Sequence, residues 1–269
     1  MVTSKPGDAA DDVHGVVSMK KVVLAGVVGA LMLVLLLTPP GTRAATEAQA
    51  GTVTVVQAVP GRTVDVRVDG KQVQGAAGVG ELLGPLRLPA GSHEVTFTDS
   101  SGELDVTSTL TVKAGSTSDV VLHRPAAVDG QPVVSSYGTP TEPIGPGKAR
   151  VLVAHTATVA PADVRVDGQT VFTNIANGEF ATADVPAGTH EVELLPTGST
   201  TQPILGPIDL TVAAGSVSMV YAVGNPRDGS MEVILHSGRL SSDGSVVPDT
   251  IRTGSAGLLA GLRVRAFPR

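Results

Sequence analysis

The sequence contains no cysteine and no tryptophan, and only 2% of its 269 residues are aromatic. Without cysteine the chain can form no disulfide, no thiolate metal site and no cysteine nucleophile. The scarcity of aromatic residues means that its cores must consist mainly of Val, Leu, Ile and Ala, which favours β-sheet. Stability therefore has to come from aliphatic packing.

Positive charge is also scarce. Beyond the N-terminal segment the only lysines are Lys71, Lys113 and Lys148, and the formal net charge is −6. A protein that follows a phosphate backbone needs clustered lysine and arginine. The composition therefore argues against a nucleic-acid partner.

One long apolar run is present. Residues 22–37 carry no polar side chain, follow Lys20 and Lys21, and are closed by Pro39 and Pro40. As a helix this run spans roughly 24 Å, less than the roughly 30 Å hydrocarbon core of a bilayer. Small residues between 44 and 50 offer cleavage sites, so residues 1–50 are predicted to hold a secretory signal and the mature protein to be extracellular or in the cell envelope.

An alternative interpretation of the same run is an uncleaved, single-pass membrane anchor with residues 1–19 in the cytoplasm, which the two lysines also permit. Asp8, Asp11 and Asp12 fit the start of a signal peptide badly. Translation from Met1 and translation from Met19 therefore both stay open.

The remainder of the chain contains the same series of sequence motifs twice. Three motifs recur at offsets of 98, 97 and 100 residues: 65–70 as 163–168, 88–95 as 185–192, and 110–116 as 210–216. A period of this length is the size of a small domain. The sequence thus predicts a tandem duplication.

Each copy shows the pattern of short strands. In 64–68 valine alternates with charged residues, which is the period of a half-buried strand, and Asp69-Gly70 supplies the residues of a tight hairpin. Six or seven such strands are expected per copy, without an amphipathic helix. The predicted fold is all-β, with two tandem antiparallel β-sandwiches.

The expected boundaries follow from composition. They are a first sandwich over 51–134, a Pro/Gly-rich linker over 135–148, a second sandwich over 149–236 and an extended tail over 237–269. A semi-rigid linker of this kind means that the two sandwiches need not pack on each other. The tail, apolar at intervals over 246–259, is predicted to add as a strand to a sheet edge, in its own domain or in a partner.

In the second copy Arg150-Val151 leads to His155, and the stretches 160–168 and 185–192 follow. By these motifs the second copy resembles the secreted bacterial family named domain of unknown function 4397. The first copy has Gln57 in place of His155 and is a more distant relative. The resemblance implies immunoglobulin-like or transthyretin-like sandwiches on envelope proteins of actinobacteria. The family carries no established catalytic residues that could be transferred.

Two histidines recur at one position, His93 and His190. Paired ligands or bases would be one interpretation. The other is that each lies on the apolar face of its strand with its ring nitrogens bonded to nearby backbone. No second histidine or carboxylate cluster accompanies them at ligand spacing, so the structural role is preferred.

Two aspartate pairs recur as well. Asp65 and Asp69, like Asp163 and Asp167, flank an arginine, and the simplest interpretation is that the arginine neutralises both neighbours. The loop spacing of calcium sites is absent. We therefore expect no catalytic residue, no cofactor and no metal.

The leading hypothesis is a non-enzymatic envelope protein whose sandwiches act as spacer or docking modules for another envelope protein, through a sheet edge or the tail. The alternative is an accessory hydrolase or carbohydrate-active module with its site in the loops 174–180 and 197–206 of the second copy. Carbohydrate binding usually needs exposed aromatic rings on which a sugar can stack. The sequence offers few candidates for this role: Tyr137, Tyr221, Phe172 and Phe180.

Overall fold

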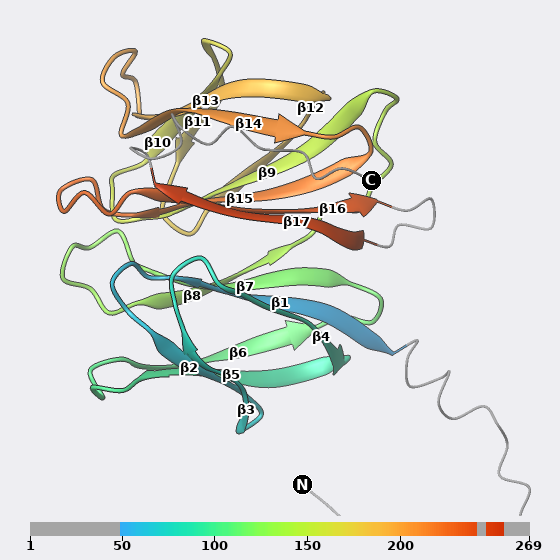
Figure 1. Ribbon diagram of the computed structural model, residues 1–269, viewed down its shortest axis with the longest axis vertical. Coiled ribbons are helices and arrows are strands. Elements are labelled where there is room, and N and C mark those ends of the chain that lie inside the picture. Colours follow the sequence, from blue (N-terminus) through green and yellow to red (C-terminus); the bar gives the residue numbers. More distant parts are fainter. Residues whose placement is uncertain (1–48, 241–245, 256–269) are drawn as a thin grey trace, which may run out of the picture. The chain divides into compact units, whose positions relative to one another are not determined.

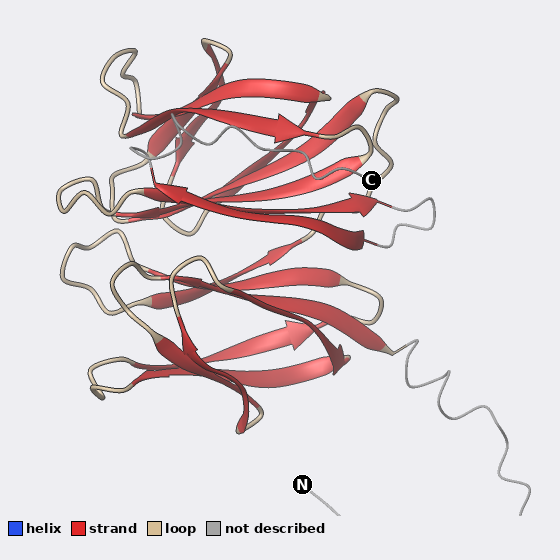
Figure 2. Ribbon diagram, viewed as in Figure 1, coloured by secondary structure: helices blue, strands red, loops and turns tan. Residues whose placement is uncertain are grey.

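The computed structural model describes residues 49–240 and 246–255, and all regular elements in this part are strands (Figures 1 and 2). The predicted signal over 22–37 and the end of the tail lie outside the described residues. The part of the chain that the structure describes contains no helix with the length and apolarity that a bilayer span requires.

The first copy forms eight strands and the second nine. They are β1 (Ala50–Ala58), β2 (Val64–Val68), β3 (Lys71–Ala77), β4 (Leu82–Pro89), β5 (Gly91–Asp99), β6 (Asp105–Val112), β7 (Thr117–His123), β8 (Val133–Gly138), β9 (Lys148–Ala157), β10 (Ala162–Val166), β11 (Gln169–Ile175), β12 (Phe180–Pro186), β13 (Gly188–Pro196), β14 (Leu205–Val212), β15 (Ser216–Gly224), β16 (Glu232–Leu240) and β17 (Val246–Ser255).

These strands build two β-sandwiches, as the sequence predicted. The first has an outer sheet, β3-β2-β5-β6, and an inner sheet, β4-β1-β7-β8; the second has an inner sheet, β12-β9-β15-β16-β17, and an outer sheet, β11-β10-β13-β14. Most neighbours are antiparallel. One pair in each inner sheet is parallel, β1 with β7 and β9 with β15, which the expectation of purely antiparallel sheets did not include.

The predicted hairpin turns are confirmed. Asp69 and Gly70 have φ angles of 50° and 74°, and Asp167 and Gly168 have 49° and 77°. Two successive residues in the left-handed region are typical of the turn whose twist matches a two-residue hairpin. The two sandwiches therefore share the same local geometry at this turn.

Three apolar clusters hold the strands together. One fills each sandwich between its inner and outer sheets, and the third joins the two inner sheets to each other. That third cluster contains Val56 and Val121 from the first sandwich and Leu152, Met219 and Ile234 from the second. The expectation that the sandwiches need not pack on each other is therefore wrong.

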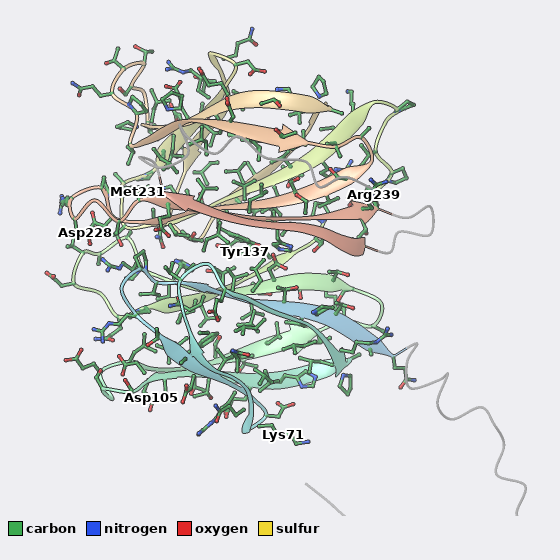
Figure 3. The ribbon with its side chains drawn as sticks, viewed as in Figure 1. Lys71, Asp105, Tyr137, Asp228, Met231 and Arg239 are labelled. Atoms are coloured by element: carbon green, nitrogen blue, oxygen red, sulfur yellow. The ribbon has the colours of Figure 1, made fainter. Side chains whose placement is uncertain are left out.

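The segment expected to be a linker is partly a strand. Residues 133–138 form β8, which pairs antiparallel with β7 and completes the inner sheet of the first sandwich. Its Tyr137 is only 1% exposed because it lies in the cluster between the two inner sheets (Figure 3). The proline-rich composition marks only residues 139–147, which connect β8 to β9.

The tail also forms a strand. β16 runs to Leu240, beyond the expected end of the second sandwich, and β17 pairs with it antiparallel from Val246 to Ser255. Addition to a sheet edge of its own domain, one of the two arrangements expected of the tail, is therefore observed.

Candidate functional site

The most unusual group of side chains lies between the two inner sheets. Asp119 of β7 is fully buried, and its Oδ2 accepts a hydrogen bond of 2.5 Å from the hydroxyl of Tyr221 on β15. The same oxygen is bonded to Nε2 of His236 on β16. The other carboxylate oxygen, Oδ1, has no hydrogen-bond partner among the residues that the structure describes. We call these three residues the junction cluster.

Strand alternation explains why an aspartate reaches this position. Successive side chains of a strand point to opposite faces. On β7, Val120 and Leu122 enter the core of the first sandwich, so Asp119 and Val121 point to the second sandwich. On β15, Met219 and Tyr221 point back toward them.

Burial controls the titration of the aromatic hydroxyls here. Burial raises the pKa of Tyr221 well above its ordinary value, and the neighbouring Asp119 carboxylate adds to this effect. Burial also raises the pKa of Tyr137, to about 12. These raised pKa values keep both hydroxyls protonated at neutral pH. The ring centroids of the two tyrosines are 5.6 Å apart.

A small cavity of about 20 Å³ adjoins the junction cluster, large enough for about one water molecule. Its lining includes His236 and Ser237 from the second sandwich and Thr52, Thr54 and Thr117 from the first. The side chain of His236 is 15% exposed. The carboxylate is therefore shielded from solvent while its histidine partner is not fully enclosed.

Polar contacts at one end of the junction add to the cluster. Arg124, just after β7, forms an ion pair of 3.0 Å with Asp228. Its carbonyl oxygen accepts a hydrogen bond from the side chain of Asn177, and the Pro125 carbonyl accepts one from the hydroxyl of Thr158. The loop 174–180, where the alternative hypothesis placed a sugar or hydrolase site, is thus anchored against the first sandwich.

Two further buried histidines lie near this end. His123 bonds to the Arg124 carbonyl and to the Ser135 hydroxyl, whereas His155 bonds only to the Ala160 carbonyl and its Nδ1 is buried without a partner. Burial lowers the pKa of both. Burial therefore favours the neutral form of both rings.

One ring nitrogen of each recurring histidine bonds to nearby backbone, as the preferred interpretation expected. In each copy Nε2 lies 2.8 Å from the carbonyl of a turn proline, Pro89 for His93 and Pro186 for His190. The Nδ1 atoms lie 2.7 Å from Asp69 and Asp167, a partner that the sequence did not indicate. Hydrogen bonding to these aspartates raises the pKa of both histidines.

The aspartate pairs do not act together. Asp65 and Asp163 accept hydrogen bonds from the amides of Ala76 and Asn174 on the neighbouring strands. The expectation that Arg165 neutralises its neighbours in sequence is wrong. Arg165 binds Glu193 across the sheet, because the two side chains point to the same face. Among the described residues no group of three His, Asp or Glu side chains could hold a metal ion.

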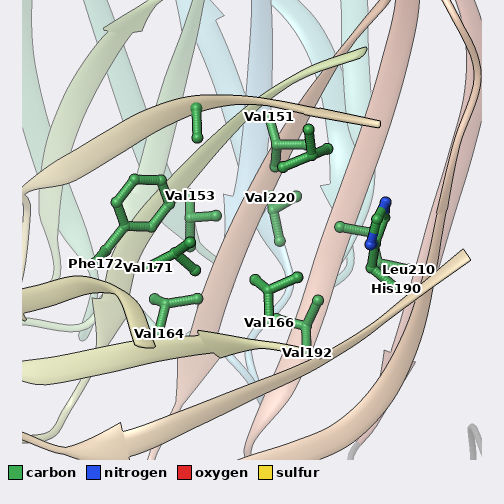
Figure 4. A pocket seen from close by; sticks show the side chains of 12 residues that line it. Val151, Val153, Val164, Val166, Val171, Phe172, His190, Val192, Leu210 and Val220 are labelled. Atoms are coloured by element: carbon green, nitrogen blue, oxygen red, sulfur yellow. The ribbon is translucent and has the colours of Figure 1, made fainter. Parts of the chain in front are cut away.

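The second sandwich contains an apolar cavity of about 30 Å³, lined by valines, Phe172 and the ring of His190 (Figure 4). The duplication explains it. Ala183 and Val185 of β12 stand where the first copy has Leu86 and Leu88, and the register agrees, since Leu86 pairs with Val53 and Ala183 with the equivalent Val151.

The remaining expected site residues are separated. Phe172 packs against the core of the second sandwich, and Phe180 is 50% exposed with its ring edge-on to Tyr137. In the loop 197–206, the Gly198 amide donates to Asp163 and the Thr200 carbonyl accepts from Arg165, so this loop fixes two side chains of β10.

Sequence reasoning missed the junction cluster, although a signal was present. The runs Val120–Leu122, Val151–Ala154 and Met219–Val223 are continuously apolar, the pattern of strands covered on both faces. A single sandwich covers only one face of each sheet. The runs therefore required a second layer, and Asp119 is the charged residue beside one of them.

Comparison with known proteins gives one family. The family model described as Domain of unknown function (DUF4397) matches residues 51–162. The match confirms the family that the sequence indicated, but it covers the first copy and the start of the second, including His155, rather than the second copy as a whole. No curated protein sequence matches the chain.

Proposed function

Because residues 51–162 belong to the family described as Domain of unknown function (DUF4397), which names no activity, we propose that the protein is an exported cell-envelope protein that works without catalysis. In this proposal the two sandwiches form a spacer that holds a docking surface for another envelope protein. Export rests on the signal pattern in residues 1–50, and the docking role on the edge strands of the sheets.

The observation that carries the spacer role is the apolar cluster between the inner sheets, with the Asp119 carboxylate buried inside it. A buried carboxylate is costly unless its hydrogen bonds are kept. Separation of the sandwiches would remove the Tyr221 and His236 partners and expose the apolar faces together. A spacer needs two sandwiches held in a fixed geometry, rather than two domains that move independently on a linker.

A docked partner would use a free edge. β12 and β17 end the inner sheet of the second sandwich, and β4 and β8 end that of the first. Unpaired backbone groups along such strands accept an added strand, and main-chain hydrogen bonds then provide the affinity. β12 carries few charges, with Asp184 its only charged side chain.

The test combines location, shape and capture. N-terminal sequencing of envelope and culture fractions should find a chain beginning between Ala45 and Gly51; a chain that keeps Lys20 would be membrane-anchored instead. Distances between spin labels on the two sandwiches should give one narrow distribution. A broad distribution would contradict the spacer role, and failure of the mature chain to retain any envelope protein in crosslinked pull-downs would contradict docking.

A further inference from the structure

The strands that end the four described sheets are of two kinds. Five of them, β3, β4, β11, β14 and β17, pair with their neighbour through a shift of register. An irregularity of this kind interrupts the row of backbone groups with which a further strand could pair. The other three, β6, β8 and β12, keep an unbroken register. These three edges are therefore regular enough to accept another strand.

The three regular edges lie together on one side of the molecule. β6 contacts β8 within the first sandwich. Tyr137 of β8 places its ring edge-on to Phe180 of β12, with 5.8 Å between the ring centroids, and its hydroxyl donates to the carbonyl of Gly178, just before β12. β4 and β17 end the two inner sheets at their other edges. Three successive layers thus present their regular edges on the same side.

The hydrogen bonds of β12 show which of its backbone groups are available. The amide of Ala187 donates to the carbonyl of Gly147, in line with the register between β12 and β9, and a bond at the other end of the strand has the same parity. In an antiparallel pair every second residue exchanges bonds with its neighbour, and the residues between them turn theirs the other way. The amides of Phe180, Thr182 and Asp184 therefore point to the open side of β12.

This side of the molecule is almost uncharged. β8 has no charged side chain, and β6 has only Asp105, at its first residue. In β12 the single charged residue, Asp184, is bound by Arg150 at 2.7 and 2.9 Å. Phe180 is 50% exposed and Val133 of β8 is 38% exposed. Edge strands that must stay single are usually protected by charge, proline or bulges, and these three have little of that protection.

We propose that this side is the interface of a symmetric dimer, in which β12 pairs antiparallel with β12 of a second molecule of the same chain. A two-fold axis perpendicular to the sheets gives this orientation. It also keeps each layer at its own height, so β8 and β6 meet their own counterparts. The pairing needs neither export nor a different protein, and it therefore goes beyond the proposed docking role.

Charge favours a second molecule as the occupant. Because the side is nearly neutral, bringing two such sides together opposes no like charges. The ends of β12 are complementary: the exposed Glu179 precedes the strand, and the exposed Lys148 pairs with Pro186 at its end. Antiparallel pairing brings the acidic end of one molecule to the basic end of the other.

The available area also fits a dimer. A strand of seven residues is about 23 Å long, and three stacked edges at spacings of about 10 Å cover about 30 Å. Each molecule then contributes roughly 700 Å², close to the about 800 Å² per partner of a standard interface.

Sedimentation of the purified full chain tests the dimer, and we expect a monomer–dimer equilibrium that depends on concentration. Thr182→Pro removes one outward amide and leaves the bonds to β9 in place. The first copy has this residue already, since Pro85 of β4 stands at the position of Thr182. The substitution should raise the dissociation constant roughly tenfold or more, because each dimer loses two main-chain hydrogen bonds.

Thr182→Val is the matched control. It removes the same hydroxyl but keeps the amide, so its dissociation constant should stay within about twofold of that of the unmodified chain. A dimer that Thr182→Pro leaves unchanged would assign association to another surface and overturn the proposal. A chain that stays monomeric at every accessible concentration would do the same.

Hydrogen exchange on the unmodified chain gives a second measurement that requires no variant to fold. Protection over 180–184 and 133–138 should rise with protein concentration, whereas exchange over 82–89 of β4 should stay constant. Protection that rises at β4 in place of β12 would contradict the pairing. Protection of 180–184 that appears only when a different protein is added would assign the edge to that protein and overturn the proposal.

Discussion

The hydroxyl of Tyr221 in the second sandwich donates a hydrogen bond to the carboxylate of Asp119 in the first, and both residues are 0% exposed. This bond joins the two sandwiches, which the sequence analysis expected to be independent of each other. Asp119 has one other side-chain partner, His236, for the same oxygen. The carboxylate therefore depends on the contact between the sandwiches.

Tyr221→Phe should lower the free energy of unfolding by about 1–3 kcal/mol, because a charged acceptor loses a buried donor. Tyr137→Phe is the control, since its hydroxyl donates to the Gly178 carbonyl at 3.2 Å, a neutral and partly exposed acceptor. It should cost about 0.5–1.5 kcal/mol. Denaturant unfolding followed by circular dichroism measures both, and equal losses would contradict the special role of Asp119.

The pH dependence of stability should carry the contribution of His93 and His190. Both ring nitrogens face oxygen acceptors, so only the protonated ring makes both bonds, and their pKa values are raised in the folded state. Their contribution is fully present below the unfolded pKa of about 6.5 and is lost as pH rises through the folded pKa.

His123 and His155 contribute with the opposite sign, because burial lowers their pKa. The contribution of His93 and His190 is therefore measured as the difference in unfolding free energy between the unmodified protein and the double variant His93→Gln with His190→Gln. The difference in unfolding free energy should be largest between about pH 5 and 6 and shrink toward pH 8. Each substitution should cost at most about 1–2 kcal/mol. A difference that grows with pH would be inconsistent with this geometry.

His155→Gln should preserve or raise stability. Nδ1 of His155 is buried without a partner, a condition that costs about 1–3 kcal/mol. The first copy has Gln57 at the equivalent position, and its amide bonds to the Val59 amide and to the carbonyls of Val59 and Arg62. The reverse change, Gln57→His, should destabilise. Melting temperatures of the two variants check the pair, and a lower value for His155→Gln or a higher value for Gln57→His would contradict this account.

Filling the cavity of the second sandwich should stabilise it. Ala183→Leu introduces the residue of the first copy, Leu86, and should add about 0.5–2 kcal/mol to the unfolding free energy. The reciprocal variant, Leu86→Ala, should lose about 1–3 kcal/mol, since Leu86 is only partly buried against its core. Calorimetry separates these outcomes, and destabilisation by both would show that β12 cannot accept the larger side chain.

Much of the architecture could be predicted because local patterns determine it. The alternation in 64–68, the Asp-Gly turns and the repeated motifs predict strands, hairpins and two sandwiches, and the structure has them. The bond between one ring nitrogen of His93 or His190 and nearby backbone was also expected, from their place on the apolar face of a strand. These features depend on residues close in sequence or on strict periods of two.

The arrangement of the sandwiches was decided only in the tertiary structure. Asp119 and Tyr221 are 102 residues apart, and no local pattern selects one as the partner of the other. The composition of 135–148 predicts a linker, yet Val133–Gly138 gains more by completing the inner sheet and burying Tyr137.

The sequence by itself therefore determined the strands, the turns and the duplication, because these follow from backbone preference and from which face of a strand is apolar. The tertiary structure decided which covered faces meet, because burial of β7, β9 and β15 on both sides can be satisfied only when the two inner sheets pack together. That packing brings Asp119, Tyr221 and His236 to one point.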